Sequence, residues 1–297
     1  MSRTLLKHLR HPLVRRQNRN LVLFGFLIFL VLVLGQEVAE LAPKNPKRGI
    51  VFLFNSTYPT DYQEFTGSGN SITWYYNYGQ SPSSQLASSQ WEFVPMVWGK
   101  DQAKSIQGNV NKIKSAGGRV SHILGFNEPD IPRKWGGSDM SPTDAATLWK
   151  QYIQPLSSQG IKLCTPGVSS SPDGFTWMSN FFSACSGCTF DLLCLHHYGR
   201  PASSLKAHLE KYHKIYPSLP VWLTEFADSK DTADNTRQYI NQVLPQLDSA
   251  PYIERYSYFG ASRELVSNVG PNAALLDNDG ELKPIGRAYF FAENLRA

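Results

Sequence analysis

The sequence predicts an α/β fold and, within that class, a single-domain (β/α)8 TIM barrel over residues 47–297. Short apolar runs bounded by Gly, Pro or Asp, which are typical of buried strands, alternate with longer segments of helical pattern. This alternation favours a parallel sheet with right-handed crossovers. Eight runs within about 250 residues fit a barrel better than an open sheet, and no glycine-rich phosphate loop follows the first run. A nucleotide-binding fold is therefore not expected.

Each strand is expected where an apolar run meets a turn residue. The eight expected strands are residues 49–54, 71–76, 93–98, 122–126, 160–165, 190–196, 220–225 and 255–259.

Helical patterns are expected between the later strands. The six expected helices are residues 101–116, 141–158, 173–184, 203–216, 232–247 and 284–295. The second of them should begin at Ser141 as N-cap, with Pro142 at the first helical position. Residues 55–70 and 77–90 are rich in Ser, Gly, Asn and Tyr, so loops are expected after the first two strands.

Residues 1–35 form a predicted leader, and residues 36–46 a linker. Six basic residues precede an apolar run over residues 21–34, which is short for a membrane span of about 20 residues and typical of a signal peptide. Two alternatives follow: cleavage before Gln36, or an uncleaved type II anchor with a cytoplasmic N-terminus. The first predicts a secreted or cell-wall protein. The second predicts a membrane-anchored one, whose main domain still lies outside the cytosol.

The net charge of +5 arises from the leader. Residues 1–35 hold six of the 29 basic residues and none of the 24 acidic ones, so the remainder has 23 basic and 24 acidic residues. A nearly neutral body gives no indication of nucleic-acid binding. No nucleic-acid partner is therefore expected, and a membrane is expected as a partner only through an uncleaved leader.

Four cysteines fit an oxidising compartment. A local disulfide between Cys185 and Cys188 is expected in the loop before a strand. Cys164 and Cys194 lie inside apolar runs, and two alternatives remain for them: two buried thiols, or a disulfide between adjacent strands. The four lack the paired spacing of a zinc site, so no metal is expected.

Two glutamates carry the functional prediction. Glu128 follows an apolar run and precedes Pro129, and Glu225 closes another run. Carboxylates at the C-terminal ends of barrel strands lie where barrel enzymes keep their chemistry, so the two are expected to converge. Cleavage of a glycosidic bond needs such a pair: one protonates the leaving oxygen, and the other attacks the sugar or activates water. We expect Glu128 to be the acid/base and Glu225 the nucleophile of a glycoside hydrolase.

Aromatic residues are dense near the expected strand ends, and sugar rings present apolar C–H faces to them. Tyr76, Trp98, Trp135 and Tyr258 are expected to contact the substrate, the first three because each lies at or just past a strand end. The alternative for any one ring is packing in the core or at the rim.

Phe-Asn-Glu-Pro-Asp (residues 126–130) and Trp-Leu-Thr-Glu-Phe (residues 222–226) resemble clan A retaining glycosidases. More narrowly, the chain resembles glycoside hydrolase family 128, fungal endo-β-1,3-glucanases of the alkali-sensitive-linkage type. Further motifs support this narrower resemblance: Lys-Arg-Gly (47–49), Tyr-Tyr-Asn (75–77), and Cys-x-x-Cys-x-x-Asp with His-x-Tyr-Gly between residues 185 and 199. The resemblance covers residues 47–295.

The resemblance implies retaining, endo-acting cleavage of β-1,3-glucan by double displacement, with no cofactor and no metal. It implies that Asn127 bonds the sugar 2-hydroxyl and that His196 and Tyr198 lie at the site near Glu225. One departure is His197, where the family has an aromatic residue, usually Trp. Substrate contacts at that position are left open.

The expected partner is a β-glucan polysaccharide or oligosaccharide, bound by a monomer. Two other functions fit the same barrel: a β-glucan-binding wall protein with little or no turnover, and a wall-remodelling transglycosylase that passes the sugar to another sugar instead of water.

Asn55-Ser56-Thr57 is the only N-glycosylation sequon of the chain. It is expected on the rim of the site, where a glycan would obstruct the cleft, and its occupancy is left open.

Overall fold

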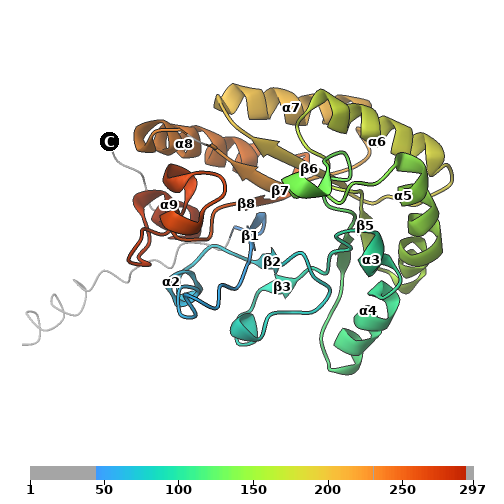
Figure 1. Ribbon diagram of the computed structural model, residues 1–297, viewed down its shortest axis with the longest axis horizontal. Helices are drawn as coiled ribbons and strands as arrows, with labels where there is room; N and C mark the ends of the chain where they lie inside the picture. Colours follow the sequence, from blue (N-terminus) through green and yellow to red (C-terminus); the bar gives the residue numbers. More distant parts are fainter. Residues whose placement is uncertain (1–44, 230, 292–297) are drawn as a thin grey trace, which may run out of the picture. The chain divides into compact units, whose positions relative to one another are not determined.

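The computed structural model describes residues 45–229 and 231–291, which belong to one compact unit (Figure 1). The predicted leader, most of the predicted linker and the end of the last predicted helix lie outside the described residues. Within the described part, no helix combines the length and the apolar character needed to cross a bilayer.

The described residues form eight strands, one for each apolar run of the sequence. They are β1 (Arg48–Val51), β2 (Trp74–Tyr76), β3 (Glu92–Phe93), β4 (His122–Leu124), β5 (Lys162–Cys164), β6 (Leu193–Tyr198), β7 (Val221–Ala227) and β8 (Ile253–Tyr258). Six pair in the order β3-β2-β1-β8-β7-β6, and β4 pairs with β5 in a second sheet. All of these pairings are parallel, so the predicted α/β class with a parallel sheet is confirmed.

Backbone hydrogen bonds continue the pairing between the two sheets. Val97 N donates to Leu124 O (3.0 Å) and Leu124 N to Pro95 O (2.9 Å), which joins the chain after β3 to β4. Thr165 N donates to Leu192 O (3.0 Å), which joins the chain after β5 to the start of β6. These bonds lie between edges of the two sheets, and within the larger sheet β8 pairs with β1.

Helices lie outside the strands (Figure 1). They are α2 (Gln63–Thr66), α3 (Lys100–Ala103), α4 (Ile106–Ser115), α5 (Pro142–Leu148), α6 (Pro172–Ala184), α7 (Ala202–Ile215), α8 (Ala233–Ser249) and α9 (Pro284–Phe291). The loops expected after the first two strands hold the single turn α2 and a 3-10 turn at Ser84–Leu86.

Two predicted helices are interrupted. The segment 101–116 divides into α3 and α4 at Ser105, whose hydroxyl lies 2.9 Å from the carbonyl of Gln102 and so competes with the helical backbone bonds. The segment 141–158 begins as expected, with the Ser141 side chain accepting from Asp144 N. After Leu148 it continues as a π turn and a 3-10 segment that contains Pro155, which has no N–H to continue an α-helical ladder.

The strands enclose an apolar cluster that supports the functional end of the sheet. Its members are Val51, Trp74, Tyr76, Val94, Met96, Leu124, Cys164, Leu192, Cys194 and Trp222. Gly49 makes room for it, because a Cβ at that position would lie 2.1 Å from the indole of Trp74. Disulfides join Cys164 to Cys194 and Cys185 to Cys188. The first answers the question left open by the sequence: it links the end of β5 to β6.

Candidate active site

Glu128 and Glu225 converge from β4 and β7. Glu225 was predicted to be the last residue of its strand, but it lies within β7 and is buried. The parallel partners continue past it, because β6 and β8 pair with β7 up to Ala227 and Phe226 respectively. Glu128 lies just after β4 with a positive φ of 39°, and its N–H donates to Gly167 O (2.7 Å). This bond fixes a backbone conformation that non-glycine residues rarely adopt.

His196 of β6 lies between the two carboxylates. Its Nδ1 is 3.0 Å from Glu128 Oε1 and 3.3 Å from Glu225 Oε2. One ligand atom from each of the three residues lies within 4.8 Å of the other two, so the glutamate oxygens are no farther apart than that. Two carboxylates and an imidazole are also a donor set that could hold a cation.

Two phenols fix the orientation of Glu225. Tyr198 Oη donates to Oε2 (2.6 Å) and Tyr78 Oη donates to Oε1 (2.6 Å). Tyr76, expected to contact substrate, is fully buried and instead donates to Thr224 O (2.9 Å), with Glu225 Oε1 3.4 Å away. Sequence reasoning did not select Tyr78. The sequence signal for it is indirect, namely that Asn-Tyr-Gly (residues 77–79) follows β2 directly; in the structure Tyr78 has a positive φ of 58°.

The charges of the cluster shift two pKa values upward. Burial raises the pKa of Glu225, and the charge of Glu128 adds to this, while His196 and the phenols of Tyr198 and Tyr78 oppose it. Burial by itself would lower the pKa of His196, but the carboxylates of Glu225 and Glu128 outweigh it and raise the pKa. The cluster of two carboxylates and one imidazole therefore favours binding of a proton.

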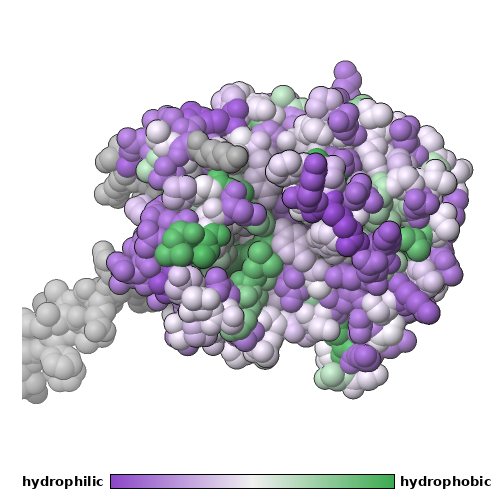
Figure 2. Space-filling model, in the orientation of Figure 1, coloured by the Kyte–Doolittle hydropathy of each residue, from purple (hydrophilic) through white to green (hydrophobic). Residues whose placement is uncertain are grey.

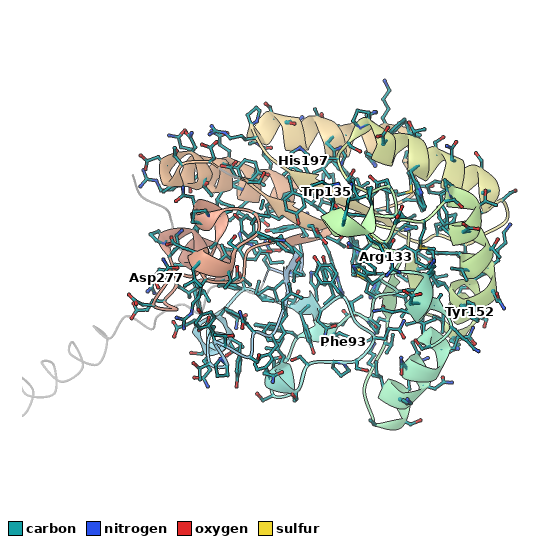
Figure 3. The ribbon with its side chains drawn as sticks, viewed as in Figure 1. Phe93, Arg133, Trp135, Tyr152, His197 and Asp277 are labelled. Carbon is teal, nitrogen blue, oxygen red and sulfur yellow. A yellow bond between two sulfur atoms is a disulfide. The ribbon has the colours of Figure 1, made fainter. Side chains whose placement is uncertain are left out.

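A cavity of about 420 Å³ opens above the glutamates, which is within the range of about 300–1,000 Å³ usual for small-ligand sites. Of the predicted substrate contacts, Asn127, Trp98, Trp135 and Tyr198 line it, together with Tyr78, Phe259 and Leu53. Asn127 is buried and its Oδ1 has no partner among the described residues. Trp135 is 72% exposed and lies on the turn after β4, where Figure 3 labels it beside Arg133.

Figure 2 shows apolar surface on either side of a hollow on the face that it displays. Leu53, which lines the cavity, is 51% exposed and so contributes apolar surface to the rim of the cavity.

Tyr258, an expected contact, and His197, whose contacts were left open, both lie away from the cavity. Tyr258 was predicted to contact substrate, but it is fully buried and its hydroxyl donates to Ala273 O (3.0 Å), so that prediction is wrong. Its ring packs edge-on against Phe226 in the core, on the helix side of the strands. His197 faces α7, with its ring 5.4 Å from that of His208 (Figure 3). The departure from the family at His197 therefore does not touch the cavity.

The loop that carries Glu128 is tied to the next strand connection. Asp130 accepts hydrogen bonds from the backbone N–H (3.1 Å) and the hydroxyl of Ser169. Ser171, which follows Ser169, caps α6 by accepting from Gly174 N (3.0 Å). The chain from Glu128 to Asp130 is thus anchored to the start of a helix.

Comparisons with known proteins identify the family of the chain. Residues 49–289 match the family model described as "Glycosyl hydrolase catalytic core". The chain is 35% identical over 226 residues to Alkali-sensitive linkage protein 1 of Schizosaccharomyces pombe; the match covers 73% of this chain and 40% of that protein.

Three solved structures of glycoside hydrolase family 128 are similar. A curdlan-specific exo-β-1,3-glucanase from Blastomyces gilchristii, in complex with glucose, is 29% identical (TM-score 0.68; 83% of this chain, 98% of that one). An endo-β-1,3-glucanase from Sorangium cellulosum is 28% identical (TM-score 0.68; 84% and 100%). An oligosaccharide-binding protein from Cryptococcus neoformans is 25% identical (TM-score 0.64; 84% and 94%). The chain belongs to the glycosyl hydrolase catalytic core family, as its resemblance to glycoside hydrolase family 128 implied.

Proposed function

We propose that the protein is a retaining endo-β-1,3-glucanase that uses Glu128 and Glu225 for double displacement. The observation that carries the proposal is the spacing of the two carboxylates, whose oxygens lie within 4.8 Å across His196. Retaining enzymes hold their carboxyl groups about 5–5.5 Å apart, and inverting enzymes leave about 6.5–9.5 Å for a water molecule. Oxygens this close are nearer the retaining range than the inverting one, which supports direct attack by one glutamate.

The surroundings of the two glutamates assign their roles. The Glu225 side chain is 5% exposed and accepts a phenol on each oxygen, which holds it in one orientation for attack on the anomeric carbon. Glu128 is more open to the cavity, with 15% of its side chain exposed, so it can reach both the leaving oxygen and the incoming water.

The reaction then has two steps. Glu128 gives its proton to the glycosidic oxygen while Glu225 bonds to the anomeric carbon and the glycosidic C–O bond breaks. Water next attacks that carbon, gives a proton to Glu128, and releases Glu225. His196 contacts both acids and can stabilise the negative charge of whichever carboxylate is ionised at each step.

Substrate contacts follow from the cavity walls. The amide of Asn127 lies beside Glu128 with its Oδ1 unpartnered among the described residues, and we assign it to the sugar 2-hydroxyl. Trp98 and Trp135 offer aromatic faces for sugar rings. The glucan linkage rests on the family 128 enzymes described above. We infer endo action from Trp135, because an exposed aromatic surface at the cavity suits a glucan chain that continues past the cleavage site.

The same proposal includes a closed (β/α)8 barrel. The bridges from β3 to β4 and from β5 to β6 support closure, because they connect the edges of the two sheets. It also includes a secreted or wall-facing monomer, which rests on the leader sequence and the disulfides.

Activity on linear β-1,3-glucan tests the proposal. We expect the wild-type protein to release reducing ends, and Glu128→Gln and Glu225→Gln each to lose at least about 1,000-fold in kcat while still binding oligosaccharide. Asp173→Asn, an exposed acid at the start of α6, is the control and should keep activity. If either glutamine variant retained wild-type turnover, the assignment would be wrong.

A second candidate is a non-catalytic glucan-binding protein, which the oligosaccharide-binding relative from Cryptococcus neoformans favours. The intact glutamate pair argues against it, since binding sugar does not need two acids whose oxygens lie within 4.8 Å of each other. Tight binding without release of reducing ends from several β-glucans would favour this second function.

A further inference from the structure

We propose that Asn55 carries an N-linked glycan that lies along a second hollow beside the catalytic cavity and narrows the cleft on that side. The modification requires entry into the secretory pathway. Its effect on the cleft rests on the function proposed above.

The sequon lies on an accessible turn after β1. Ser56 and Thr57 are exposed and Asn55 is half-buried. Thr57 N–H donates to Asn55 Oδ1 (2.9 Å), and none of the hydrogen bonds between described residues uses the Asn55 Nδ2. The atom that receives the sugar is therefore not engaged elsewhere, and a transferase can reach the loop without unfolding a strand.

Asn55 also lines a hollow of about 470 Å³. Leu53, Phe259 and Asn268 line both this hollow and the catalytic cavity, so the two are neighbours along one cleft. A group attached at Asn55 thus stands next to the path that a glucan chain would follow beyond Glu225.

The walls of the hollow suit a sugar. Phe54 and Val266 are 45% and 44% exposed, an apolar surface that sugar C–H faces can cover. Arg263, which also lines the hollow, is held by Asp61 (2.8 and 2.6 Å) and lies over the ring of Tyr58 (4.1 Å), which gives a fixed polar surface for hydroxyl groups. Covalent attachment would keep sugar at this surface at high effective concentration.

The transfer itself balances with one co-reactant, a lipid-pyrophosphate-linked oligosaccharide. The Asn55 Nδ2 attacks the anomeric carbon of the first sugar, an N–C bond forms, and the C–O bond to the pyrophosphate breaks. The amide loses one proton, and the lipid pyrophosphate leaves with the electron pair of the broken bond.

Expression of the full chain in a yeast host tests the modification. Thr57→Ala removes the sequon while keeping Asn55, and Thr57→Ser keeps the sequon, so the two form a matched pair at an exposed position. We expect a loss of gel mobility, reversed by an N-glycan-releasing amidase, in the wild type and Thr57→Ser but not in Thr57→Ala. Peptide mass spectrometry should find the released Asn55 converted to Asp.

Each outcome decides the proposal. An unmodified Asn55 in the wild type overturns the proposal. Protection of the chain from protease in microsomes then shows whether the chain entered the secretory pathway without being glycosylated or did not enter it. If the glycan is present, Thr57→Ala should raise the ratio of activity on polymeric glucan to activity on short oligosaccharides. An unchanged ratio overturns the placement along the cleft. Absence of activity on every glucan, with the glycan present, contradicts the proposed hydrolase and leaves the modification standing.

Discussion

Glu225 is held by one phenol on each carboxylate oxygen, and the donors come from two different strand ends. Tyr78→Phe removes one donor without changing the ring. A hydrogen bond to a charged group contributes about 1.5–3 kcal/mol, so we expect kcat to fall roughly 10- to 100-fold with little change in KM.

The pH profile distinguishes this effect from a packing defect. The phenol lowers the pKa of Glu225, so its loss should raise that pKa further and shift the acidic limb of kcat/KM to higher pH. Tyr216→Phe, at a ring stacked on Phe182 away from the cavity, is the matched control and should leave the profile unchanged. An unshifted acidic limb in Tyr78→Phe would contradict the role of the phenol.

Gly167 lies against the Nε2 edge of the His196 ring. A Cβ there would come within 2.8 Å of His196 Nε2, closer than side-chain carbons are found. Gly167→Ala should displace the imidazole from the two acids and lower kcat at least about 10-fold, since small misplacements in a catalytic group can cost 100-fold. Gly108→Ala, in α4 with nothing within 4 Å of its Cβ, should keep activity and unfold at higher urea concentration. Equal kcat values for the two variants would contradict this account.

At this scale the sequence predicts the acids better than their neighbours. Glu128 and Glu225 follow from strand ends alone, because the carboxyl ends of parallel strands meet at one edge. Tyr78 and Tyr258 do not follow, because a tyrosine at a strand end can face the cavity or the helices. Which of these it does depends on tertiary packing.

At the scale of the elements, α7 packs on β6 through the half-buried His208, which faces the buried His197. His197 lies 3.3 Å from Ser204, and its ring is 5.4 Å from that of His208. Burial lowers the pKa of each histidine from 6.5 to about 4. Between these two values the unfolded chain binds the proton that the folded protein excludes, so stability is full above pH 6.5 and falls as the pH drops toward 4.

His197→Gln tests this, because glutamine keeps a polar side chain and cannot titrate. The free energy of unfolding of both proteins should fall when the pH is lowered from 7 to 4.5. The fall should be about 2–3 kcal/mol smaller in the variant than in the wild type. Urea unfolding at the two values measures the difference. His213→Gln, at a half-buried ring stacked on Tyr252, is the control. The same loss in all three proteins would show that His197 does not carry the effect.

Every expected strand overlaps an observed one, because apolar runs between turn residues form strands in the fold, but the expected strand 93–98 shares only Phe93 with β3. The helix interruptions at Ser105 and Pro155 were not predicted. Each depends on a local competition for backbone carbonyls within an otherwise helical pattern.

At the scale of the whole molecule, the alternation of strands and helices predicts the parallel α/β architecture. It does not predict which strand edges join, because the links from β3 to β4 and from β5 to β6 consist of isolated bridges. The pairing of Cys164 with Cys194 likewise depends on β5 lying beside β6, which sequence spacing alone does not fix. Only with these neighbours in place do residues from β2, β4, β6 and β7 reach one cavity.

The central claim is that Glu225 attacks the sugar directly while Glu128, with an oxygen within 4.8 Å of it, acts as acid and base, and the configuration of the first product tests this claim. Proton NMR during cleavage of a linear β-1,3-glucan oligosaccharide follows the anomeric signals before they equilibrate. Double displacement predicts that the new reducing end first appears as the β anomer. First appearance of the α anomer would mean a single displacement by water, which would contradict the assignment of Glu225 as nucleophile.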